Sequence, residues 1–116
     1  MRVPNWIEEL FGALDDGNVD AFCSFLTDDV DFIYASEGTT SGRDAVYEFV
    51  SGFVESIESS DHRIDDVITT PERVLVRGDV TYVRLDGSEL TVPFADVFEM
   101  DGEAIDVYQV YVDQDL

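Results

Sequence analysis

Asp96 is the first residue of this sequence whose surroundings point to chemistry. Residues 90–100 alternate as a β-strand does, and side chains two apart in a strand share a face. On that face Asp96 is the only charged group, and its neighbours there are Leu90, Val92, Phe94, Phe98 and Met100. A carboxyl group in apolar surroundings resists ionisation, so its pKa should rise, and it can then act as a general acid or as a donor to an oxyanion. Three alternatives stay open. A bulge at Pro93 would turn Asp96 to solvent, or Asp96 could pair with a buried arginine or cap a backbone group.

His62 is the second candidate, because it is the only histidine and histidine is the side chain that titrates near neutral pH. It shares a predicted strand face with Ile64, so it could point inward and act as a base beside Asp96. The local sequence favours the other interpretation, an exposed position at a strand start after residues 59–61.

Further polar side chains alternate with apolar ones. Tyr34 ends a predicted strand that begins at Val30, and Gln109 and Tyr111 share one face of the last predicted strand with Ile105. No metal-binding motif, phosphate loop or nucleophile elbow is present, so we expect no cofactor and no metal. Three carboxylate pairs lack the spacing of a calcium loop and are interpreted as solvated surface. These pairs are Asp15-Asp16, Asp28-Asp29 and Asp65-Asp66.

Helices precede strands along the chain. Apolar residues at helical spacing predict three helices, with stripes over 6–14, 19–26 and 46–57. Residues 35–42 are small and polar, which indicates a loop. Alternation and turn residues predict strands over 30–34, 62–69, 74–84, 90–100 and 104–113, with hairpin turns at Asp86-Gly87 and Asp101-Gly102 and a bulge or bend at Gly78. This order predicts an α+β layout ending in an antiparallel meander.

The charge of the chain is extreme. It has 27 acidic residues against six basic ones, all arginine, for a formal net charge of −21. Such lysine-free, aspartate-rich composition resembles that of proteins from halophiles that accumulate salt, archaea especially. Salt at about 1 M shortens the Debye length to roughly 3 Å and screens the repulsion among carboxylates. Nucleic acids and anionic membranes are excluded as partners, since both need a basic surface.

Size and composition indicate one globular domain over residues 1–116. Hydrophobic residues make up 45% of the chain, but no apolar run is long enough to span a bilayer, and we see no secretory leader. The single cysteine, Cys23, excludes an internal disulfide. We therefore expect a cytoplasmic protein.

Four segments follow one another in a fixed order: ALDDGNVD at 13–20, FLTDDV at 25–30, GRDAV at 42–46 and DVFEMDG at 96–102. Each segment alone contains only residues that are typical of turns and helix caps. Together the four segments resemble those of the nuclear transport factor 2-like superfamily, and of the SnoaL-like proteins within it. The resemblance covers nearly the whole chain. It implies a curved, mixed or antiparallel sheet with the N-terminal helices packed in its concave face, forming a cone with an apolar cavity.

The resemblance also implies which residues contact a ligand. In such a cone a small hydrophobic molecule would meet Trp6, Leu10, Tyr34, Phe53, Phe98, Gln109 and Tyr111, beside Asp96 and His62 as the catalytic pair, as in dehydratases of the superfamily. Asp96 falls where ketosteroid isomerase keeps a protonated aspartic acid. That enzyme's general-base aspartate would fall at about Tyr34 and its oxyanion tyrosine at about Leu10, so steroid isomerase activity is not expected.

The opposite sheet face is too apolar for solvent in a small domain. It is expected to carry Thr91, Pro93, Ala95 and Val97 on one strand and Tyr108, Val110 and Val112 on the next. Dimers through this face are usual in the superfamily, so we expect a homodimer. Two functions stay open: a proton-transfer enzyme such as an isomerase, cyclase or dehydratase, or a non-catalytic scaffold or ligand-binding domain with a filled cavity.

Overall fold

The computed structural model describes residues 3–35 and 37–112, so Asp113, the expected end of the last strand, lies outside the described residues. Within them lie the helices α1 (Asn5–Asp15), α2 (Val19–Cys23) and α3 (Arg43–Glu55). The strands are β1 (Leu26–Tyr34), β2 (Thr39–Ser41), β3 (Ile57–Thr69), β4 (Arg73–Arg84), β5 (Glu89–Asp101) and β6 (Ala104–Val112).

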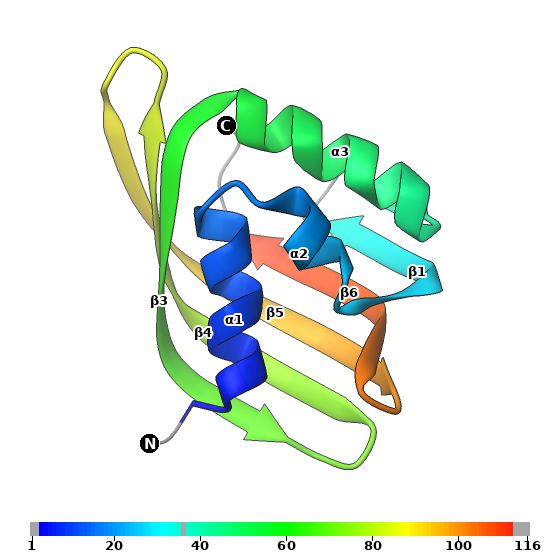
Figure 1. Cartoon of the computed structure of the whole chain (residues 1–116). Coiled ribbons are helices and arrows are strands. Elements are labelled where there is room, and N and C mark those ends of the chain that lie inside the picture. The colour runs from blue at the N-terminus through cyan, green and yellow to red at the C-terminus, as the bar shows by residue number, and fades with distance from the viewer. Residues whose placement is uncertain (1–2, 36, 113–116) are drawn as a thin grey trace.

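The strands form one mixed sheet in the order β2-β1-β6-β5-β4-β3. Strand β1 runs parallel to β6, and the other described pairs are antiparallel. The helices lie on one face of this sheet, and the long strand β3 curves around α1 (Figure 1). The expected α+β fold is confirmed, with a sheet that stays open because β2 and β3 are unpaired on their outer sides within the described residues.

A tight turn between α1 and α2 brings the end of α1 against β3. Gly17 has a φ of 71°, which favours glycine, and the Asn18 side chain caps α2 by accepting from the Ala21 N–H at 3.1 Å. This turn holds the last residue of α1, Asp15, beside the first half of β3.

Element boundaries differ from the sequence prediction at four places. The second helix ends at Cys23, and β1 begins at Leu26 rather than at residue 30. Residues 39–41 of the predicted loop pair with β1 as a short edge strand. Strand β3 begins at Ile57 rather than at residue 62. Its first residues after Ile57 are mostly exposed and polar, so alternation does not mark them, and pairing with β4 alone makes them a strand.

The registers of the central strands decide which side chains face the helices. The bulge expected near Gly78 lies on the partner strand, where the β3–β4 register shifts between Ile64 and Asp66. A Cβ on Gly78 would lie 1.8 Å from the Arg63 carbonyl oxygen, so only glycine fits there. The β4–β5 register has no shift, so Pro93 introduces no bulge.

The apolar core fills the space between the helices and the sheet. Ile7, Leu10 and Phe11 of α1 are buried in it, as are Val46 and Val50 of α3. No helix in the described part of the chain is long and apolar enough to cross a membrane.

Candidate functional site

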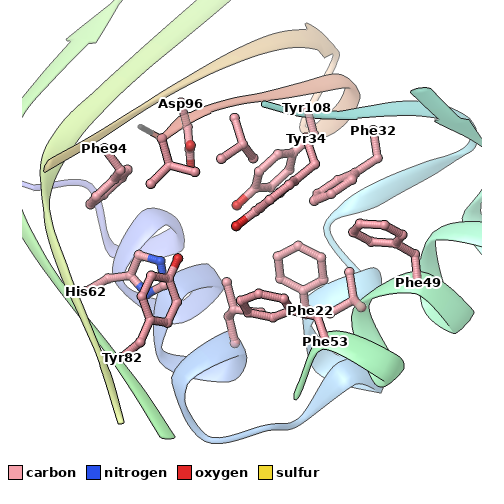
Figure 2. A pocket seen from close by; sticks show the side chains of 14 residues that line it. Phe22, Phe32, Tyr34, Phe49, Phe53, His62, Tyr82, Phe94, Asp96 and Tyr108 are labelled. Atoms are coloured by element: carbon pink, nitrogen blue, oxygen red, sulfur yellow. The ribbon is translucent and has the colours of Figure 1, made fainter. Parts of the chain in front are cut away.

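A small cavity of about 40 Å³ lies between the helices and the inner face of the sheet. Its wall is aromatic, with five phenylalanines and three tyrosines, namely Phe22, Phe32, Phe49, Phe53, Phe94, Tyr34, Tyr82 and Tyr108. Asp96 and His62 are the ionisable groups of the wall besides the tyrosines. Figure 2 shows Asp96 and His62 entering the cavity from different strands. Polar groups able to move or hold a proton are therefore set into an otherwise apolar space.

Asp96 is the buried charged residue of the described chain, with 3% of its surface exposed. Because the β4–β5 register is unbroken, it keeps the inward orientation that alternation predicts. Its Oδ1 atom has no hydrogen-bond partner among the described residues. Burial raises the pKa of this carboxyl well above its usual range, and a hydrogen bond with the Tyr108 hydroxyl lowers it by less. Burial therefore favours the neutral form of this group, and one of its oxygens is free for a ligand.

Tyrosine hydroxyls surround the acid. Burial raises the pKa of Tyr108 well above its usual value, and the nearby Asp96 adds to the rise. Burial also raises the pKa of Tyr82, with a smaller contribution from Tyr34, to which it is hydrogen bonded. Both hydroxyls therefore stay protonated and serve as donors.

His62 is anchored by Asp15, a contact that the sequence did not reveal. The His62 Nδ1 lies 2.6 Å from Asp15 Oδ1, and the His62 backbone N–H donates to Asp15 Oδ2 at 2.9 Å. The Ser60 hydroxyl donates to Asp15 Oδ1 at 2.8 Å. The His62 side chain is 8% exposed, so the favoured prediction of a solvent-exposed histidine is wrong. The interpretation of Asp15 as solvated surface is also wrong.

This pairing fixes the tautomer of the imidazole. An ionised carboxylate only accepts hydrogen bonds, so the proton of neutral His62 lies on Nδ1 and Nε2 keeps its lone pair. The ring packs between Phe11, with centroids 5.0 Å apart, and Phe94, at 5.2 Å. His62 is therefore a positioned base on the cavity wall, supported by a carboxylate.

The other residues expected to contact a ligand divide into two groups. Tyr34 and Phe53 line the cavity. Leu10 and Phe98 are fully buried in the core beside it, and the Trp6 ring lies 6.2 Å from that of Phe98. These three belong to the packing around the cavity rather than to its wall.

The expected orientation of Gln109 and Tyr111 is wrong. The β5–β6 register shifts between Glu99 and Met100, where Asp106 is the extra residue on β6. This bulge reverses the alternation, because one added residue exchanges the two faces. Gln109 pairs with Val97 and lies on the outer face, and Tyr111 is 51% exposed there. The same shift turns Tyr108, Val110 and Val112 inward, where they line the cavity.

The carboxylate pairs make ion pairs rather than a metal site. Arg43 contacts Asp28 at 2.5 Å, Arg63 contacts Asp65 and Arg77 contacts Asp66. In the part of the chain that the structure describes, no group of three His, Cys, Asp or Glu side chains could hold a metal ion.

The family model of the SnoaL-like domain matches residues 7–108 of this chain. Solved structures share its fold. A protein from Catenulispora acidiphila with a ketosteroid isomerase-like fold, in complex with trimethylamine, has a TM-score of 0.86 at 19% identity, over 95% of this chain and 86% of that one. A putative SnoaL-like polyketide cyclase from Jannaschia sp. CCS1 has a TM-score of 0.78 at 17% identity, over 97% and 90%. An LEH-like epoxide hydrolase from M. tuberculosis has a TM-score of 0.80 at 17% identity, over 92% and 79%. No curated protein matches the chain.

Proposed function

Because the chain belongs to the SnoaL-like domain family and a cavity lies between its helices and sheet, we propose that it binds a small hydrophobic molecule there and transfers a proton on it. The reaction would be that of an isomerase, cyclase or dehydratase that needs no cofactor. The observation that supports this most is the buried Asp96 with its unpartnered Oδ1 in an aromatic cavity.

Asp96 would act on the oxygen of a bound carbonyl compound, and Tyr108 would support it. The Tyr108 hydroxyl donates to Asp96, and the neutral carboxyl donates its own proton to the carbonyl oxygen, where it stabilises the negative charge that develops when a neighbouring carbon loses a proton. The apolar wall excludes water, which strengthens these interactions. A neutral acid beside tyrosines is the arrangement that this stabilisation requires.

His62 would carry the proton. Its Nε2 lone pair takes the proton from the carbon next to the carbonyl, and the imidazolium that forms is stabilised by the Asp15 carboxylate at Nδ1. The same proton can then return to a different carbon, which isomerises the substrate, or protonate a leaving hydroxyl, which dehydrates it. Each step balances with Asp96 acting only as a hydrogen-bond donor.

The second candidate function is a non-catalytic domain with a filled cavity. The observation in its favour is the volume of about 40 Å³, because pockets for drug-sized ligands measure roughly 300–1,000 Å³. In this case the aromatic side chains are themselves the filling, and only small molecules or water would enter.

A thermal-shift screen in molar KCl separates the two functions. The panel comprises small cyclic and aryl ketones, lactones, terpenoids, aromatic polyketides and steroids. A ligand at about 100 times its Kd adds roughly 2.7 kcal/mol of stability, which moves the midpoint by several degrees. We expect a hit among the small ketones whose shift is lost in Asp96→Leu, which removes the hydrogen-bond donor, and kept in the exposed control Asp101→Asn. No shift across the panel would support the filled cavity instead.

We also propose that the outer face of the sheet forms a homodimer. Three of the six arginines gather on this face and pair with acids, as Arg63 does with Asp79 and Arg73 with Glu99 at 3.9 Å. These arginines offset part of the acidic charge of this face, so a second copy meets less repulsion there than on a surface without arginine.

The dimer is tested by light scattering in molar KCl. Tyr111→Glu places a charge on this face and should give a monomer, whereas Tyr47→Glu on α3 should leave the mass unchanged. A wild-type protein that is monomeric at all salt concentrations contradicts the proposal.

A further inference from the structure

A second hollow of about 150 Å³ adjoins the cavity at the junction of the α1–α2 turn, the end of α3 and the start of β3. Leu14 and Phe53 line both spaces, so these two side chains form the wall between them. Both are only partly buried. A shift of either side chain would join the hollow to the cavity, and the 40 Å³ cavity needs such added room before it can hold an organic molecule.

The outer rim of this hollow is acidic. Asp15, Asp16 and Glu58 line it together with Ser59 and Ser60. No arginine lines the hollow or the cavity within the described residues. A second feature points to a ligand at the end of this route, because the 97% buried Asp96 turns an unpartnered oxygen into the cavity.

We propose that ligands reach Asp96 between Leu14 and Phe53, through a mouth whose carboxylates reject anions, so that the substrate is an uncharged compound. This inference rests on the proposed function in one respect only, that the cavity receives a ligand. Carboxylates at the mouth repel acids before they reach the cavity, and no arginine among the described residues along the route compensates for the charge of an acid.

A competing route lies on the other side. Phe94 and Val112 line both the cavity and an open hollow on the outer sheet face, whose rim includes Arg77. The Phe94 ring is buried and packs against Phe11 and His62, so opening there would disturb the positioned base. The route past Leu14 and Phe53 leaves these ring contacts in place.

Access is measured with a thiol inside the cavity. Val110 lines the cavity and pairs with Asp96 across β5 and β6, and Val110→Cys is nearly isosteric. The substitution is made in a Cys23→Ala background, which removes the one native thiol. The thiol is modified with iodoacetamide, which is neutral, and with iodoacetate, its anionic counterpart. The rates of both reagents are also measured at Ser88→Cys, on an exposed hairpin turn. This control gives the effect of the net charge of the protein and the intrinsic difference in reactivity between the two reagents.

The expected result has two parts. The ratio of the iodoacetamide rate to the iodoacetate rate at Val110→Cys exceeds that at Ser88→Cys by about fivefold, the Boltzmann factor of one close like-charge contact in water. Asp16→Asn with Glu58→Gln brings the two ratios together. Leu14→Ala and Phe53→Leu each accelerate the reaction of iodoacetamide with the cavity thiol but not with the thiol of Ser88→Cys.

A matched control separates opening of the mouth from general loosening. Leu26→Ala removes the same atoms from a fully buried site that lines neither space. Equal acceleration by Leu26→Ala overturns the route, as does acceleration by Val112→Ala without any by Leu14→Ala or Phe53→Leu. Equal rate ratios at the two thiols overturn the selection against anions. The labelling needs no substrate, so these results stand apart from the ligand screen, whose failure would instead contradict the proposed function.

Discussion

Replacing Asp96 by asparagine should change how the stability of the protein depends on pH. Burial raises the pKa of this carboxyl in the folded chain. In the unfolded chain an aspartate ionises near pH 3.9, so about one proton is released there that the folded chain still holds. The unfolded state then binds fewer protons than the folded state. By linkage, the stability that this group contributes is complete below about pH 4 and is lost as the pH rises toward the folded-state pKa.

The magnitude follows from the one proton involved. While Asp96 stays protonated in the folded chain, each pH unit above about pH 4 lowers the free energy of unfolding by about 1.4 kcal/mol. Asparagine does not ionise, so the variant lacks this loss. The stability of Asp96→Asn relative to wild type should therefore rise by about 1.4 kcal/mol per pH unit, from about pH 4 up to the folded-state pKa of Asp96. A constant offset from the altered contact with Tyr108 does not affect this slope.

The assay is urea denaturation at fixed molar KCl over a series of pH values. Asp101→Asn, at the exposed end of β5, removes one carboxylate from the surface and serves as the control. Only the slope of Asp96→Asn in excess of this control is assigned to burial. Parallel profiles for wild type and Asp96→Asn would refute the reasoning, because they would mean that Asp96 ionises alike in the folded and unfolded chains.

Three further predictions test the fold, the base and the charge. Gly78→Ala should lower the free energy of unfolding by about 1–3 kcal/mol, because its Cβ meets the Arg63 carbonyl. Gly12→Ala, in the open face of α1, should raise it by about 0.5–1 kcal/mol. Urea midpoints of the two variants that move in the same direction would contradict this. Asp15→Asn should lower any proton-transfer rate by about 10²- to 10⁴-fold through the loss of the imidazolium partner of His62; an unchanged rate would leave the dyad without a role. Raising KCl from about 0.1 M to 1 M should raise Tm, since it shortens the Debye length from roughly 10 Å to 3 Å; a Tm that is flat or falls with salt would contradict the expected adaptation to salt.

Sequence reasoning located the inner acid but not the whole cavity wall. Alternation was sufficient for Asp96 because the β4–β5 register is unbroken. It failed for Gln109 and Tyr111 because a bulge at Asp106 exchanges the faces of β6. No glycine or proline marks that bulge in the sequence, where Asp106 stands between Ile105 and Val107 in an otherwise regular strand pattern.

The partner of His62 could not be read from local sequence. Asp15 and Ser60 are 45 residues apart and meet only when α1 packs against β3. One signal was available, since Asp15 ends α1, where the helix dipole disfavours a carboxylate. An acid placed against that preference indicates a partner elsewhere in the fold, and here the partner is the candidate base.

Solvent deuterium exchange tests the central claim most directly. The tightest-binding ketone of the ligand screen is incubated with protein in D₂O at molar KCl, and ¹H NMR follows the signal of the hydrogens next to its carbonyl. Proton transfer by His62, with Asp96 as the hydrogen-bond donor, predicts that wild type accelerates the loss of this signal over buffer. Asp96→Leu, which removes the donor, and His62→Gln should each abolish the acceleration, while Asp101→Asn keeps it. A bound ketone that exchanges no faster than in buffer, or equally fast with all four proteins, would contradict the account and leave a domain that binds without catalysis.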